Sequence, residues 1–189
     1  MSKSKKKAPK EYDFTLLIEG ASAITPELEN AIFEAGCDDA TIGRRHGRMY
    51  VTFSRTAPSL REAILSAILA IHGCGNTLRV LRVDVCGLIT QAEIARKLGR
   101  SRQLIHQYMT GHRGPGGFPP PACNVADKAP LWNWCEVAQW LARNELISRE
   151  ALQEAQETAV VNSVLDLEYQ RWVAPELTQQ VMNSLCPGT

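Results

Sequence analysis

A short segment, residues 100–113, carries polar and basic side chains of the types that hydrogen-bond to nucleobase edges. In a helix over 101–110, which turns by about 100° per residue, Gln103, His106 and Thr110 share one arc of the surface. Arginine pairs with guanine, and glutamine pairs with adenine, in the major groove of DNA. The predicted DNA-binding residues are Arg100, Ser101, Arg102, Gln103, His106, Gln107, Thr110 and Arg113.

Positive charge is concentrated around the same segment. Residues 91–113 hold five basic side chains and one acid, Glu93. Such an excess favours contact with the phosphates of a nucleic acid. The alternative is an ordinary helical hairpin whose polar face meets only solvent. The five basic residues are Arg96, Lys97, Arg100, Arg102 and Arg113.

Two short helices joined by a tight turn are predicted to carry these side chains. Thr90 and Glu93 have the spacing of a capping box, which starts a helix. Gly99 ends this helix, because glycine readily adopts the left-handed conformation of a sharp exit, and Ser101 is the N-cap of the next helix. The expected inward-facing positions are Ala92, Ala95 and Leu98 in the first helix and Leu104, Ile105 and Tyr108 in the second.

A loop and a further pair of elements follow the two helices. Residues 111–121 are too rich in glycine and proline for a helix or a strand. Residues 131–134, with the sequence LWNW, predict a short strand. Residues 135–141 predict a helix, and its inward-facing side chains are Val137, Trp140 and Leu141.

Residues 88–141 resemble the winged helix-turn-helix of the AlpA/excisionase group, which is related to the MerR-type regulators of bacteria and phages. The resemblance rests on the sequence TQAEIARKLGRSRQLIHQYMTG, followed by FPPP, LWNW and EVAQWL. It implies that 101–110 is the recognition helix and that 113–118 lies at the wing, near the DNA backbone or the minor groove. The loop is long for that group, and the chain shows no effector-binding cysteine pattern like that of metal-sensing MerR proteins.

Residues 12–86 predict a separate α+β domain, a ferredoxin-like sandwich with the element order βαββαβ. Its first strand begins at Tyr12, where apolar residues occupy alternate positions. Its first helix begins at Thr25-Pro26, because proline suits the first turn of a helix. This fold supports many functions, so it assigns none by itself.

The second half of this domain carries equally local signals. A hairpin with a basic tip is predicted at 44–48, and Ser59 begins a second capping box and helix. The last strand, 78–85, changes its alternation at Val80-Leu81. A bulge or a bend accounts for such a change.

The sequence contains no residue set typical of catalysis. It has no phosphate-binding glycine motif, no nucleophile elbow and no carboxylate pair suited to acid–base work, so we expect no enzyme, no catalytic residue and no cofactor. Its six cysteines include no C-x-x-C pair, so we expect no metal site. The arginines at 44, 45 and 48 form either a solvated hairpin tip or a second nucleic-acid contact.

The two ends of the chain have opposite charge. Residues 1–11 form a basic arm with five lysines in the first ten positions, and we expect it to be disordered. Residues 145–189 form an acidic, amphipathic helical tail, with seven acids against two arginines. This tail either mediates dimerisation or packs back on its own chain. Its apolar stripe is Leu152, Ala155, Ala159, Val160, Val164 and Leu167.

No apolar run in the sequence approaches the length of a membrane span or follows the lysine arm as a signal peptide would require. We therefore expect a cytoplasmic protein without membrane contact. The predicted domains are 12–86, a winged helix-turn-helix over 87–144, and the tail.

These observations predict a sequence-specific regulator of transcription that binds double-stranded DNA as a homodimer. Either the tail or the N-terminal sheet provides the dimer interface, and we favour the tail. One alternative is an antitoxin-like adaptor that binds a protein partner through 12–86 or 145–189 and represses its own operon. Another is an excisionase-like factor that bends DNA during recombination.

Overall fold

The computed structural model describes residues 8–75, 78–126 and 129–186. The chain is an α+β protein that divides into two compact units. The first unit comprises residues 1–84 with 160–189, and the second comprises 85–159. Within the described part of the chain, no helix has the length and apolar content that a membrane crossing requires. The predicted arm falls largely on residues 1–7, outside the described residues.

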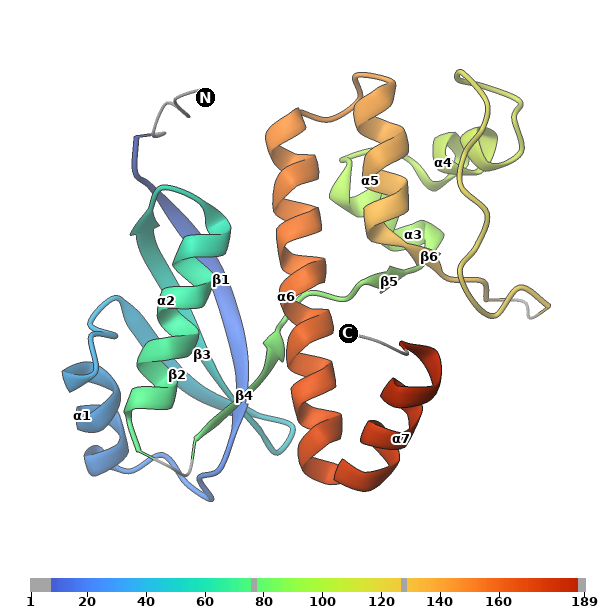
Figure 1. The fold of residues 1–189 in the computed structure, drawn as a ribbon. Coiled ribbons are helices and arrows are strands. Elements are labelled where there is room, and N and C mark those ends of the chain that lie inside the picture. The colour runs from blue at the N-terminus through green and yellow to red at the C-terminus, as the bar shows by residue number, and fades with distance from the viewer. Residues whose placement is uncertain (1–7, 76–77, 127–128, 187–189) are drawn as a thin grey trace, which may run out of the picture. The chain divides into compact units, whose positions relative to one another are not determined.

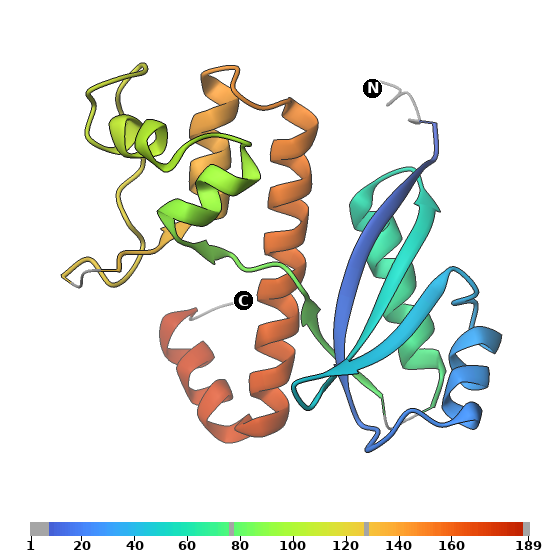
Figure 2. The ribbon, with the colours of Figure 1, turned by 180° about the vertical axis from the view of Figure 1, so that it is seen from behind.

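A four-stranded antiparallel sheet with the strand order β2-β3-β1-β4 forms the centre of the first unit (Figure 1). Two helices accompany it, and helix α2 lies over one face of the sheet in both views (Figures 1 and 2). The elements are β1 Lys10–Glu19, α1 Pro26–Glu34, β2 Ala40–Arg45, β3 Arg48–Ala57, α2 Leu60–Gly73 and β4 Arg79–Val83.

Alternation of apolar residues gives this sheet its buried face. Leu16 and Ile18 of β1 are fully buried, as are Val51 and Phe53 of β3. The ring of Phe14 stacks on Phe53 with the centroids 5.2 Å apart. Burial of such large apolar side chains is the main favourable contribution to folding of the unit.

Most local signals in this unit are confirmed. At α2, Ser59 Oγ accepts from the N–H of Glu62 at 3.2 Å as predicted, but the reciprocal bond of a capping box is not seen among the described residues. Thr25 accepts a hydrogen bond from the N–H of Leu28, and Pro26 opens α1. The β2–β3 hairpin turns through His46 and Gly47, both with positive φ (50° and 77°), as two-residue hairpin turns require. The register of β4 against β1 shifts between Leu17 and Ile18, which is the predicted bulge.

The long helix α6, Arg149–Val173, begins in the second unit and ends in the first, and α7, Pro175–Leu185, follows it. Its Asn162 side chain pairs with the last residue of β4. The N–H of Val83 donates to Asn162 Oδ1 at 2.8 Å, and Asn162 Nδ2 donates to the Val83 carbonyl at 3.1 Å. In addition, the Arg79 guanidinium lies 4.2 Å from the centroid of the Trp172 ring.

These contacts set which face of α6 is covered. Val161 and Asn162 are buried, whereas Val160, Val164 and Leu167 of the predicted apolar stripe remain exposed. Of the two alternatives for the stripe, packing back on its own chain therefore does not hold for these three residues. The reason is that the Asn162 amide bonds the sheet edge and thereby fixes the rotation of the helix.

The second unit consists of short elements around an aromatic core. Strands β5 and β6 pair antiparallel, with Leu88 opposite Asn133 and Ile89 opposite Trp132. The predicted 131–134 strand is shorter than expected, because the Asn133 side chain caps a helix that begins at Trp134. The elements are β5 Leu88–Ile89, α3 Gln91–Lys97, α4 Arg102–Met109, β6 Trp132–Asn133 and α5 Trp134–Arg143, followed by the first part of α6.

Candidate nucleic-acid interface

Helix α3 begins with the predicted capping box. The N–H of Thr90 donates to Glu93 Oε2 at 2.7 Å, and the N–H of Glu93 donates to Thr90 Oγ1 at 3.2 Å. The hydrogen bond from the Thr90 backbone is the main reason that the pKa of Glu93 lies below its ordinary value. The one acid in 91–113 is thus occupied at the start of α3 and does not neutralise α4.

The turn between α3 and α4 is fixed by three local features. Gly99 has a φ of 59°, which glycine adopts without steric cost. Ser101 Oγ accepts a hydrogen bond from the N–H of Leu104 at 3.2 Å and so caps α4. Gln91 Nε2 donates to the Arg102 carbonyl at 2.9 Å, which links the first turns of the two helices.

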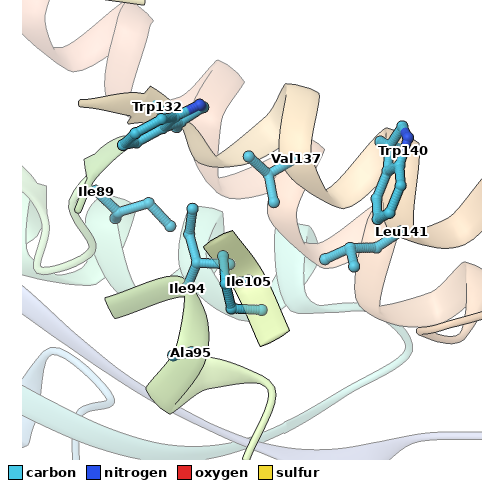
Figure 3. Close-up of a cluster of buried hydrophobic side chains, with 8 residues drawn as sticks. All are labelled: Ile89, Ile94, Ala95, Ile105, Trp132, Val137, Trp140 and Leu141. Atoms are coloured by element: carbon cyan, nitrogen blue, oxygen red, sulfur yellow. The ribbon is translucent and has the colours of Figure 1, made fainter. Parts of the chain in front are cut away.

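A buried cluster supports both helices. Figure 3 shows Ile94 of α3 and Ile105 of α4 meeting Val137 and Leu141 of α5. The predicted inward positions need one correction, because Ile94 is fully buried while Ala92 and Leu98 are half-buried. The full cluster is Ile89, Ile94, Ala95, Ile105, Trp132, Val137, Trp140 and Leu141.

The predicted base-reading side chains of α4 lie on its outer face. Arg102, Gln103, His106 and Thr110 are exposed, and Gln107 is half-buried. The Thr110 hydroxyl donates to the His106 carbonyl at 2.9 Å. A polar face of this kind, held on a packed helix, offers donors and acceptors at fixed positions to a ligand.

Three arginines within or next to α4 have guanidinium groups without a partner among the described residues. The side chains of Arg100, Arg102 and Arg113 are exposed, and none forms an ion pair or hydrogen bond with the residues that the structure describes. The other two basic residues are engaged. Arg96 pairs with Glu93 at 3.7 Å, and the Lys97 ammonium lies 5.1 Å from the Trp134 ring centroid.

Sequence reasoning missed one side chain at this face. His112 Nδ1 and Thr110 Oγ1 are 2.7 Å apart, so the imidazole and the hydroxyl are joined by a hydrogen bond. The intervening Gly111 turns the chain back with a φ of 72°. The glycine directly after the helix was the available signal, because a left-handed residue at that position brings the following side chain back toward the last turn.

The glycine- and proline-rich loop is anchored beside α4 by tryptophan. Trp140 Nε1 donates to the Gly116 carbonyl at 2.8 Å, and Trp132 Nε1 donates to the Pro119 carbonyl at 3.2 Å. The Phe118 ring meets Trp140 edge-on, with the centroids 5.0 Å apart. The backbone N–H of Arg113 donates to the Gln107 carbonyl at 3.2 Å, so the loop also bonds directly to α4.

No family model matches the chain, and comparison with curated proteins and with solved structures found no significant match. Among the residues that the structure describes, no three His, Cys, Asp or Glu side chains gather into a group that would hold a metal ion.

Proposed function

We propose that the chain binds double-stranded DNA in a sequence-specific manner, with α4 in the major groove. The observation that carries this proposal is the outer face of α4. It presents Gln103 and His106, and the nearby guanidinium groups of Arg100, Arg102 and Arg113 have no partner among the described residues; no acidic side chain lies within α4. Glutamine and arginine read adenine and guanine by paired hydrogen bonds, and free arginines suit the flanking phosphates.

The arrangement of α3, α4 and the loop supports a winged helix-turn-helix as the DNA-binding domain. A tight turn joins two capped helices, and a third helix, α5, packs under them. The loop that contains Arg113 takes the place of the wing, and its anchoring to Trp140 keeps it beside the end of α4. In this proposal Arg113 contacts the DNA backbone or minor groove.

We further propose a ferredoxin-like sandwich for residues 12–86. The element order βαββαβ and the antiparallel strand order β2-β3-β1-β4 support it. We assign this domain to assembly of a cytoplasmic transcriptional regulator, in which two copies present two α4 helices to one DNA site.

A second candidate function is binding of a protein partner by the C-terminal helices, as in an antitoxin-like adaptor. The exposed apolar side chains favour it. Val160 is 65% exposed and Val164 is 55% exposed on α6, and Leu177 is 61% exposed on α7. Co-purification of a stoichiometric partner that depends on these residues would support this alternative.

Selection of bound duplexes from random and genomic DNA tests the main proposal. We expect repeated rounds to enrich one motif and its inverted copy. Recovery of random sequences after the same rounds would show that the chain does not read bases.

A further inference from the structure

The two edge strands of the sheet differ in how their outward backbone groups are satisfied. At β4, the Asn162 amide bonds both the N–H and the carbonyl of Val83, as a neighbouring strand would. At the opposite edge, β2, no helix supplies a comparable bond among the described residues. Unpaired strand edges are the usual template for pairing with another chain.

Hairpin geometry identifies the free backbone groups of β2. The two-residue turn makes Arg45 and Arg48 a hydrogen-bonded pair. The backbone N–H and carbonyl groups of every second residue of β2, counted back from Arg45, therefore point toward β3. The N–H of Ser54 donates to the Asp39 carbonyl at 3.1 Å, which confirms this alternation. The N–H and carbonyl groups of Ile42 and Arg44 therefore point away from the sheet, and they form no hydrogen bond with the described residues.

We propose that two copies of the chain pair through β2, antiparallel and around a two-fold axis at Ile42. The two four-stranded sheets then form one continuous sheet. In this register Ile42 bonds Ile42 of the second copy, and the N–H of Arg44 donates to the Ala40 carbonyl of the second copy. Ala40 only accepts there, because its own N–H already donates to the Cys37 carbonyl at 3.2 Å.

The charge pattern of the strand is complementary to itself in this orientation. The segment begins with Asp38 and ends with Arg45 and His46, all of them exposed. An antiparallel pair about Ile42 places Asp38 opposite His46 of the second copy and next to its Arg45. Asp39 takes no part, because Arg55 holds its carboxylate at 2.7 Å. Asp38 and Arg45 have no such partner in the described part of the chain.

Helix α1 leaves a hollow beside β2. A cavity of about 360 Å³ lies between α1 and β2, and Phe33, Ala40 and Ile42 are among its lining residues. Phe33 is 63% exposed in the single chain. Pairing through β2 brings the second copy to this side chain, which gives the large apolar ring a partner.

Charge reversal tests this interface directly, by light scattering during gel filtration in the absence of DNA. Wild type is expected to be a dimer. Arg45→Glu should raise the dimer dissociation constant on the order of 100-fold or more, because it places a second carboxylate beside Asp38 of the other copy at two symmetric sites. The double variant Asp38→Lys with Arg45→Glu should restore the dimer, which separates pairing from any loss of folding.

Two further variants make the test independent of charge. Ile42→Pro removes an outward N–H that no other described residue uses, so it should give a folded monomer, whereas Ile42→Val should stay a dimer.

A monomeric wild type would overturn the inference, as would a dimer that survives both Arg45→Glu and Ile42→Pro. If Val164→Lys gives a monomer while Arg45→Glu does not, the interface lies on α6 instead. Each outcome is independent of whether α4 reads DNA.

Discussion

The Trp140 indole donates its Nε1–H to the Gly116 carbonyl at 2.8 Å, and this bond fixes the loop that follows α4. The same ring contacts Tyr108 of α4, with the centroids 5.4 Å apart, and Phe118 of the loop. One side chain of α5 therefore positions both parts of the candidate DNA-binding surface. The loop keeps a defined place beside α4 although its sequence is rich in glycine.

Two glycines of this loop provide a matched pair of variants. Gly114 and Gly116 both have positive φ, 86° and 76°, so alanine at either position should cost about 1–2 kcal/mol of stability. A Cβ at Gly114 would lie 2.8 Å from Tyr108 Cδ1, whereas one at Gly116 meets nothing within 4 Å. Gly114→Ala should therefore destabilise more than Gly116→Ala in urea unfolding. Equal losses would mean that the Tyr108 ring is not fixed against the loop.

The capping box should make stability depend on pH. The pKa of Glu93 is lowered in the folded chain, chiefly by the hydrogen bond from the Thr90 backbone. A carboxyl whose folded pKa lies below its unfolded pKa stabilises the fold fully above the unfolded pKa, and this contribution disappears as the pH falls through the folded pKa. Glu93→Gln should lower the free energy of unfolding at neutral pH. The free energy of unfolding of this variant should also fall less steeply than that of wild type as the pH is lowered. Parallel curves for the two proteins would contradict this role of Glu93.

Arg113 should contribute to affinity without contributing to sequence preference. Arg113→Ala should weaken binding to cognate and scrambled duplexes alike, and it should reduce the slope of log K against log salt by about 0.9, the value for one phosphate contact. Arg171→Ala is the control, because its guanidinium already pairs with Glu168 at 2.6 Å. If Arg113→Ala changes only the cognate site, Arg113 reads a base rather than the backbone.

Arg102 should contribute to recognition of the cognate site. It is the first residue of α4, its guanidinium has no partner in the described part of the chain, and its carbonyl accepts a hydrogen bond from Gln91. Arg102→Ala should cost about 1–3 kcal/mol on the cognate duplex, and less on a scrambled one, in titrations followed by fluorescence anisotropy. Gln156→Ala, an exposed change on α6, should leave both affinities unchanged. Wild-type affinity of Arg102→Ala would remove this residue from the interface.

Local features of the fold were predictable from the sequence because their causes lie within a few residues. The capping box of Thr90 and Glu93 and the left-handed Gly99 are examples, and the bulge in β4 followed from a change of alternation. Contacts between distant residues were not predictable in this way. Asn162 and Val83 are separated by 79 residues, and nothing near either one indicates the other.

In the candidate site too, local features were predictable from the sequence and contacts between distant residues were not. The outer arc of α4 followed from helical periodicity, since Gln103 and His106 are exposed as expected. The anchoring of the loop did not follow, because Trp140 and Gly116 lie 24 residues apart and a glycine-rich segment gives no sign of its partner. Tryptophan in α5 indicated a buried core residue but not the hydrogen bond of its indole.

The base preference of wild type compared with that of Gln103→Ala tests the central claim most directly. Gln103 is exposed in the first turn of α4, and a glutamine on a recognition helix specifies adenine through paired hydrogen bonds. Sequencing of the duplexes that each protein selects should give two motifs that differ at one base position and agree elsewhere. If the site is repeated, the difference should occur at that position in each copy. Identical motifs from the two proteins would contradict the assignment of α4 as the helix that reads DNA.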